Sequence, residues 1–207
     1  MSEPTLYLAS QSPRRRELLA QIGIEHQVLT VDVDESRLTG EDPDSYVERL
    51  ACAKAASGWQ ACLAGKLPAL PVLGADTVVV FEGLVLGKPR TAEEGKAMLR
   101  RLSGECHEVL TGVSLCGERG QVSCVSATQV WFRPLSDAEI DAYWNTGEPC
   151  DKAGAYGIQG LAARFVERIE GSYSGVVGLP LYETDALLRR YSVDPLPGAA
   201  APKEAGA

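Results

Sequence analysis

The chain has 207 residues, of which 45% are hydrophobic, and its formal net charge is −8 at pH 7. That length suits one large domain or two tightly joined lobes, and the acidic balance argues against a nucleic-acid-binding protein, which needs a broad basic face. Because we see neither a signal peptide nor an apolar run of the roughly 18–20 residues in a membrane span, we expect a cytoplasmic protein with no membrane partner.

Apolar runs of strand length alternate with helical patterns along the chain. The strand patterns cover 5–9, 26–31, 71–81, 107–115, 122–132 and 164–169, and the helical patterns cover 13–22, 43–64, 92–102, 136–146 and 179–191. Glu82-Gly83 and Gly117-Glu-Arg-Gly120 are typical of hairpin turns, so some strands must pair antiparallel. We therefore predict an α/β fold with a mixed sheet, followed by a disordered, proline-rich tail at 192–207.

The junction after the first strand joins apolar residues to a helix start. Ser12 is the expected N-cap, and Pro13 is the expected first helical residue. The first turn then carries Arg14, Arg15 and Arg16. Cations oppose the helix dipole there, at about 0.3–1 kcal/mol per exposed charge. A bound phosphate chain, with Ser10 and Ser12 as further donors, would offset that cost. The alternative is a solvated basic helix start in which the serines act only as caps.

Two further helix starts carry capping boxes, Thr91 with Glu94 and Ser136 with Glu139. The six cysteines form no C-x-x-C pair, so we expect reduced thiols that lie mostly in the core.

Asp76 interrupts the apolar strand 72–80. An unpaired buried carboxylate is costly, so Asp76 needs a cation, a metal or a shifted pKa, unless a bend at Gly74 exposes it. The acidic loop 32–35 could supply a second carboxylate for Mg²⁺, although such a loop is also compatible with simple solvation.

Two lysines and one glycine-rich segment complete the candidate residues. Lys54 lies among alanines on an inward face of helix 43–64, and Lys88 lies between a glycine and a proline; each could bind phosphate or lie on the surface. Segment 150–160 contains three glycines that would let the backbone approach a ligand closely. Gln159 could read a pyrimidine edge through its amide, or could be exposed in a tight turn.

Five motifs in this order resemble those of the Maf family of nucleoside triphosphate pyrophosphatases, from about Leu6 to Tyr191. They are Ala-Ser-x-Ser-Pro-Arg-Arg, Gly-Ala-Asp-Thr, Gly-Lys-Pro, Leu-Ser-Gly-x-x-His and Asp-Lys-Ala-Gly-Ala-Tyr-Gly-Ile-Gln-Gly. The resemblance implies one Maf-like domain over 1–191, with an elongated mixed β-sheet flanked by helices and two lobes around a nucleotide-binding cleft, the fold of Maf and ITPase-like proteins. It also implies a homodimer and hydrolysis of a nucleoside triphosphate with a divalent metal cation, Mg²⁺ or Mn²⁺.

The resemblance further implies roles for individual residues. Asp76 matches the catalytic proton acceptor and, with Glu35, the metal ligands; Asp32 and Asp34 could share the role of Glu35. The substrate-binding set is Ser10, Ser12, Arg14, Arg15, Lys54, Lys88 and Gln159. Arg14, Thr77 and Gln159 match the positions that separate a dTTP/UTP branch from a 7-methyl-GTP branch, and the threonine and glutamine indicate the dTTP/UTP branch.

The expected function is therefore hydrolysis of dTTP and UTP, or of modified pyrimidine nucleotides, to the monophosphate and diphosphate. Such a house-cleaning role is linked in the family to cell-division arrest. Two alternatives stay open: the same chemistry on 7-methyl-GTP or another modified nucleotide, and a non-catalytic regulator of septum formation or cell division.

Overall fold

A computed structural model of the protein describes residues 3–194. Of the predicted disordered tail, 195–207 lies outside the described residues. The strands are β1 (Leu6–Leu8), β2 (His26–Val28), β3 (Val72–Phe81), β4 (Leu84–Leu86), β5 (Cys106–Gly117), β6 (Gly120–Phe132) and β7 (Val166–Glu170). The helices are α1 (Pro13–Gln21), α2 (Pro43–Gly65), α3 (Ala92–Leu102), α4 (Asp137–Trp144), α5 (Tyr173–Val177) and α6 (Leu181–Arg190), with 3-10 helices η1 (Glu148–Asp151), η2 (Ala153–Ala155) and η3 (Leu161–Phe165).

The strands form one mixed sheet, which confirms the predicted α/β class. Their order is β2-β1-β3-β5-β6-β7, and β4 pairs beside β3. β1 is parallel to β2 and β3, whereas the other pairs are antiparallel. Both predicted hairpin turns are present. Glu82 and Gly83 have φ values of 50° and 75° between the paired residues Phe81 and Leu84, and Gly117 pairs with Gly120.

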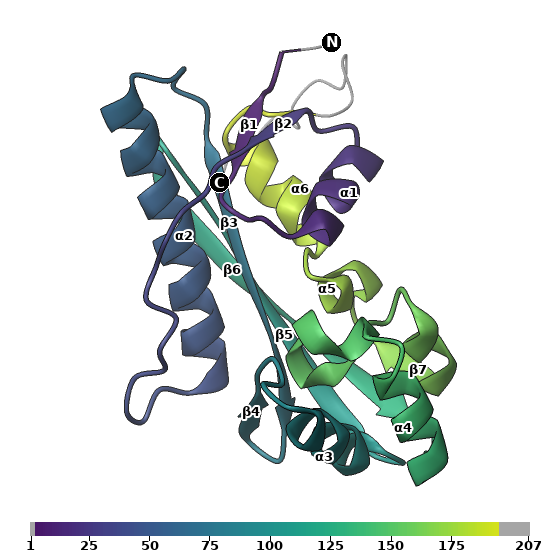
Figure 1. Ribbon diagram of the computed structural model, residues 1–207. Helices are drawn as coiled ribbons and strands as arrows, with labels where there is room; N and C mark the ends of the chain where they lie inside the picture. Colours follow the sequence, from purple (N-terminus) through teal and green to yellow (C-terminus); the bar gives the residue numbers. More distant parts are fainter. Residues whose placement is uncertain (1–2, 195–207) are drawn as a thin grey trace, which may run out of the picture.

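The helices lie on both sides of the long strands β3, β5 and β6 (Figure 1). The long helix α2 packs along one side. On the other side, one group of elements with α1 and α6 lies toward the end of the sheet that carries β1 and β2, and a second group with α3, α4 and the 3-10 helices lies toward the opposite end. These two groups correspond to the two lobes that the resemblance implies.

Glycines allow α2 to lie close to the sheet. A Cβ atom on Gly74 of β3 would overlap the backbone oxygen of Ala51 and the backbone nitrogen of Ala55, and one on Gly112 of β5 would lie 2.6 Å from the backbone oxygen of Val47. The helix backbone therefore rests directly on the strands, which brings the side chains of α2 next to those of β3.

One edge of β3 is paired only at its ends. Within residues 3–194, β1 pairs with Val72 and Leu73 on this edge, and β4 pairs with residues from Val79 onward. Residues 74–78 therefore have a strand partner on the β5 side alone. We call this stretch the β3 gap, and it contains Asp76.

The helices begin at the predicted N-cap residues, but only some of the capping hydrogen bonds are present. Ser12 is the N-cap of α1 and Pro13 its first residue, as predicted, although the Ser12 side chain makes no capping hydrogen bond. Ser136 and Glu139 form a complete capping box. Thr91 accepts from the backbone N–H of Glu94, whereas the Glu94 carboxylate accepts from the backbone N–H of Arg90, one residue too early for the reciprocal bond.

The predicted strand over 164–169 begins later because Leu161–Phe165 forms η3. The short helices between α4 and α6 were not predicted. Across the described part of the chain, no helix is both long and apolar enough to cross a membrane. Cys52, Cys62, Cys106, Cys116, Cys124 and Cys150 are all free thiols, as expected, although Cys150 is exposed.

Candidate active site

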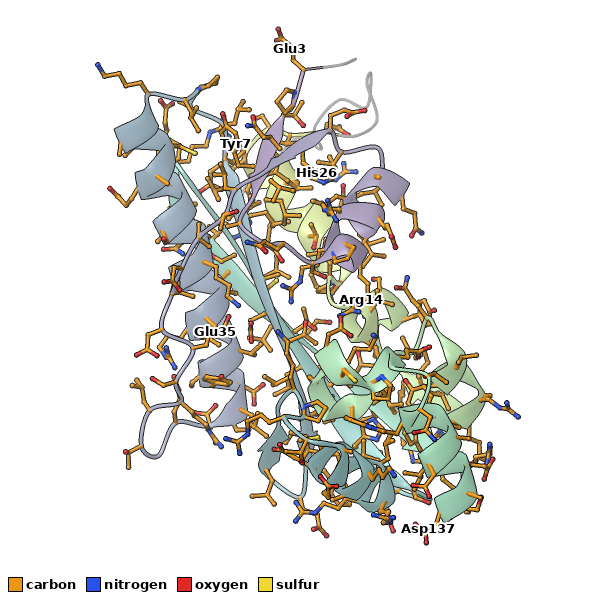
Figure 2. All side chains as sticks on the ribbon, viewed as in Figure 1. Glu3, Tyr7, Arg14, His26, Glu35 and Asp137 are labelled. Atoms are coloured by element: carbon orange, nitrogen blue, oxygen red, sulfur yellow. The ribbon has the colours of Figure 1, made fainter. Side chains whose placement is uncertain are left out.

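A cleft of about 700 Å³ lies between the two groups of elements and is closed on one side by α2. Figure 2 labels Arg14 between α1 and the 3-10 helices, and Glu35 on the segment that runs beside α2. Ten of the candidate residues identified from the sequence line this cleft: Ser10, Ser12, Arg14, Arg15, Glu35, Lys54, Asp76, Thr77, Lys88 and Gln159. The fold thus gathers side chains that are up to 149 positions apart in the chain, Ser10 to Gln159.

Lys54 joins the two candidate carboxylates. Its Nζ lies 2.6 Å from Glu35 Oε1 and 2.7 Å from Asp76 Oδ1. The side chains of Lys54 and Asp76 are only 13% and 14% exposed, whereas that of Glu35 is 56% exposed. The hydrogen bond from Lys54 lowers the pKa of Glu35 below its ordinary value, against the opposing effect of burial. The cation that Asp76 needs is therefore Lys54.

The local sequence explains why these groups meet. Lys54 lies one turn along α2 from the buried Leu50, at the point where Gly74 lets the helix touch β3. Asp76 follows two residues later on β3. The acidic loop is held by the Tyr46 hydroxyl, which donates to the backbone oxygen of Glu35 at 2.8 Å.

Glu35 is the acid of this loop that contacts the cleft residues. Asp34 is exposed, and its carboxylate accepts from both the backbone N–H and the hydroxyl of Ser36. Asp32 is also exposed, and neither aspartate lines the cleft. The structure therefore favours Glu35 over its neighbours as the second carboxylate.

Arg15 is held in place by three hydrogen bonds. Its Nε donates to the backbone oxygen of Gly178 at 2.8 Å, and its Nη1 and Nη2 donate to Ser10 Oγ and Thr77 Oγ1, each at 3.1 Å. Burial lowers the pKa of Arg15, and the nearby Asp76 opposes that effect. Since a guanidinium stays charged in proteins, Arg15 presents a fixed positive charge to the cleft.

The other two arginines of the α1 first turn behave differently. Arg14 points to the 3-10 segment, where its Nη1 lies 3.6 Å from an exposed carboxylate oxygen of Asp151. Arg16 is exposed and does not line the cleft. Two of the three arginines therefore face the place where an anion would offset the helix-dipole cost.

The glycines near Gln159 serve packing within the protein. An added Cβ on Gly154 would lie 2.9 Å from the side chain of Val79, and one on Gly160 would overlap the Glu148 carboxylate. Gly154 also needs a glycine-like backbone, with φ at 66°. These contacts give Gly154 and Gly160 a packing role, and because Gly157 and Gly160 also line the cleft, close approach of a ligand to this backbone stays a prediction.

Some side chains around the cleft are buried and support its wall, whereas others are exposed to it. Tyr156 is buried, and its hydroxyl lies 2.8 Å from Nε2 of the buried His107, so it supports the cleft wall. Burial lowers the pKa of His107 to about 4, which keeps the ring neutral at pH 7. Lys88 and Gln159 are exposed and line the cleft, where both can reach a bound molecule.

Sequence reasoning missed two residues that hold the site together. Glu148 accepts from the hydroxyl of Tyr143 at 2.8 Å and from the backbone N–H of Leu161 at 2.9 Å, and so fixes the segment that carries Gln159. Thr111 is fully buried on β5, opposite Thr77. Glu148 interrupts no apolar run, and Thr111 lies in the apolar run 107–115 but is uncharged, so neither residue stands out in the sequence as Asp76 does.

The carboxylate pair is a limited metal site. Residues 3–194 contain no group of three or more His, Cys, Asp or Glu side chains that could hold a metal ion. Glu35 and Asp76 offer hard oxygen atoms that already converge on one cation, the ammonium of Lys54. Mg²⁺ is commonly bound by one or two carboxylates together with substrate phosphates and water, so this donor set fits such an ion.

Comparison with known proteins identifies related sequences. The family model described as Maf-like protein matches residues 5–191. The chain is 58% identical to a dTTP/UTP pyrophosphatase of Saccharophagus degradans, over 91% of this chain and 89% of that protein. It is 53% identical to a dTTP/UTP pyrophosphatase of Vibrio cholerae, over 92% of this chain and 100% of that protein.

Among solved structures, the Staphylococcus aureus Ham1 protein aligns with a TM-score of 0.42 and 14% sequence identity, over 61% of this chain and 71% of that one. The family match covers nearly all of the described residues and is accompanied by relatives more than half identical to the chain, at 58% and 53%. On that evidence, the chain belongs to the Maf family.

Proposed function

We propose that the protein hydrolyses dTTP and UTP to the nucleoside monophosphate and pyrophosphate, in a house-cleaning role. The observation that carries this proposal is the convergence of Arg14, Arg15, Lys54 and Lys88 around Asp76 in one cleft. Four cations suit a triphosphate, and the Asp76 carboxylate beside them suits the activation of water. The names of the two Maf-family relatives support the choice of dTTP and UTP.

The chemistry follows from the charges. Attack of water on the α-phosphorus needs neutralisation of developing charge more than covalent help. Arg15 is pre-positioned by its three hydrogen bonds, so little reorganisation is needed when phosphate binds. Asp76 accepts the proton of the attacking water or orients that water, and Lys54 donates a hydrogen bond to its carboxylate.

Gln159 and the metal complete the proposed site. The exposed amide of Gln159 pairs with the adjacent oxygen and N–H of a thymine or uracil ring. Glu35 and Asp76 would hold Mg²⁺ or Mn²⁺, which would supply further charge neutralisation along the triphosphate. The family resemblance also supports a homodimer that acts in the cytoplasm, and we include both in the proposal.

A nucleotide panel tests the activity itself. We expect metal-dependent release of pyrophosphate from dTTP and UTP, with kcat/KM at least about tenfold above that for CTP, GTP and 7-methyl-GTP, because the Gln159 amide would pair with the adjacent oxygen and N–H of a thymine or uracil ring placed in this cleft. The measurement is coupled detection of pyrophosphate with Mg²⁺ or Mn²⁺ present. A preference for 7-methyl-GTP, or no release from any nucleotide, would contradict the proposal.

Lys54→Met tests the proposed metal ligands without catalysis. In the free protein, Lys54 neutralises both carboxylates, so it competes with a divalent ion for the same oxygens. Its removal leaves both carboxylates without their hydrogen-bonded cation, and we expect Mn²⁺ to bind roughly tenfold more tightly in the absence of nucleotide. Titration calorimetry or the paramagnetic resonance of free Mn²⁺ measures that affinity.

Lys88→Met is the matched control for this prediction. It removes the same charge from the same cleft, but Lys88 is exposed and influences Glu35 only through space. Its effect on Mn²⁺ affinity should be about twofold at most, because an exposed charge is screened by solvent. Equal effects of the two substitutions would show that net charge, rather than the shared oxygens, governs metal binding.

A further inference from the structure

Thr111 lies behind the site rather than in it. Its side chain is fully buried on β5, it pairs with Thr77 across the sheet, and it does not line the cleft. A buried hydroxyl must make hydrogen bonds to offset its loss of water. The partners of Thr111 therefore indicate what it does.

Hydrogen-bond chemistry fixes the direction of these contacts. Thr111 Oγ1 donates to the backbone oxygen of Gly175 at 2.8 Å, and a carbonyl can only accept. Since a hydroxyl has a single proton, the 3.0 Å contact between the Thr77 and Thr111 hydroxyls must have Thr77 as the donor. Thr77 Oγ1 in turn accepts from Arg15 Nη2 at 3.1 Å. We call these two linked hydroxyls, Thr77 and Thr111, the hydroxyl chain.

Two of the contacts that hold Arg15 lead to one short helix, α5. The hydroxyl chain ends on Gly175 in α5, and Arg15 Nε donates to Gly178, the C-cap of the same helix. Together with the bond to Ser10, these contacts use three of the five N–H groups of Arg15. One N–H remains on each terminal nitrogen, which is the pair used for bidentate contact with phosphate.

The count of hydroxyl protons also limits the hydrogen bonds that Thr77 can make. Its only proton is committed to Thr111, so Thr77 has no hydrogen-bond donor left for a nucleotide. Although Thr77 lines the cleft, the bonds of its hydroxyl connect Arg15 to the buried part of the sheet.

We propose that Thr111 is a positioning residue for the reaction, which acts through Thr77 to hold the Arg15 guanidinium in its phosphate-binding orientation. The proposal rests on the proposed function for the identity of the phosphate ligand. It also gives the threonine after Asp76 a role in arginine placement, separate from any contact with the base.

Kinetics of Thr111 variants test the proposal. Thr111→Val removes the hydroxyl and keeps the branched shape, and we expect KM for dTTP to rise about tenfold with a smaller change in kcat, the scale of one lost hydrogen bond. Thr111→Ser keeps the hydroxyl and should stay within about twofold of the wild type. Ser114→Ala is the control, since Ser114 is a fully buried hydroxyl on the same strand that donates instead to Val122.

A double-variant cycle separates positioning from simple loss of stability. In an Arg15→Lys background the planar guanidinium is gone, so adding Thr111→Val should cause no further rise in KM. A full tenfold rise in that background, an equal rise for Ser114→Ala, or a wild-type KM for Thr111→Val would overturn the proposal. Should Thr111→Val not fold, Thr77→Val breaks the hydroxyl chain at its partly exposed end and enters the same cycle.

Binding of inorganic pyrophosphate keeps this test independent of turnover. Calorimetry with wild type and Thr111→Val should show pyrophosphate affinity reduced about tenfold, again the value of one hydrogen bond. If the wild type hydrolyses no nucleotide, the proposed function fails, while this affinity still reports on Arg15. If the wild type is active and the two affinities are equal, the positioning role fails alone.

Discussion

Replacing Asp76 by asparagine is expected to lower kcat for dTTP by about 10³-fold, within the range typical for loss of a general base. Asparagine keeps the size of the side chain and an oxygen that Lys54 can contact, but it cannot take a proton from water. The loss should therefore appear in kcat more than in KM, since the four cations that bind phosphate remain. Steady-state pyrophosphate release measures both parameters.

The fold should survive this substitution. Lys54 keeps its 2.6 Å ion pair with Glu35, so no buried charge is left without a partner. Asp151→Asn is the matched control, because it neutralises a carboxylate that lines the same cleft but is 68% exposed and contacts Arg14 only at 3.6 Å. A kcat close to that of the wild type for Asp76→Asn would remove Asp76 from the reaction.

The second large effect concerns Gly74. A methyl group at this position would overlap backbone atoms of Ala51 and Ala55, and backbone cannot move aside as a flexible side chain can. We expect Gly74→Ala to lower the free energy of unfolding by about 3 kcal/mol or more, at the upper end for overpacked cores. For a chain of this size that corresponds to a drop of roughly 10 °C in Tm. Chemical and thermal unfolding measure these changes.

Gly65→Ala provides the comparison for this prediction. Gly65 is the last residue of the same helix, and an added Cβ there meets only the Leu67 side chain, at an ordinary 3.6 Å. Gly65→Ala should change the free energy of unfolding by at most about 1 kcal/mol, the difference in helix propensity between glycine and alanine. Equal stability of Gly74→Ala and the wild type would mean that α2 does not lie on β3 as described.

Residues that break a local pattern could be predicted from the sequence. Asp76 stands out as a charge in an apolar strand, and the arginines after Pro13 stand out as cations at a helix start. Each of the two hairpin turns also contains a glycine that adopts positive φ in the structure, Gly83 in the first turn and Gly120 in the second. In each case one short segment contains both the anomaly and its cause.

Contacts between distant segments could not be predicted in this way. The Lys54 ion pair joins residues 22 positions apart, and the bond from Thr111 to Gly175 spans 64 positions. The packing of Gly154 against Val79 and of Gly160 against Glu148 is likewise not visible in the sequence. Such roles depend on which elements meet, and that is decided by packing of the whole chain.

The β3 gap has a consequence for how the molecule avoids aggregation. An unpaired strand edge usually offers its N–H and C=O groups to a strand of another chain. Residues 74–78 span about 17 Å at about 3.4 Å per residue, and β1 and β4 close the two ends of that stretch. An incoming strand could not run past either end, whereas a compact polar ligand can enter. The protein thus denies this strand edge to intermolecular sheet growth, while Asp76 and Thr77 on the same stretch still line the cleft.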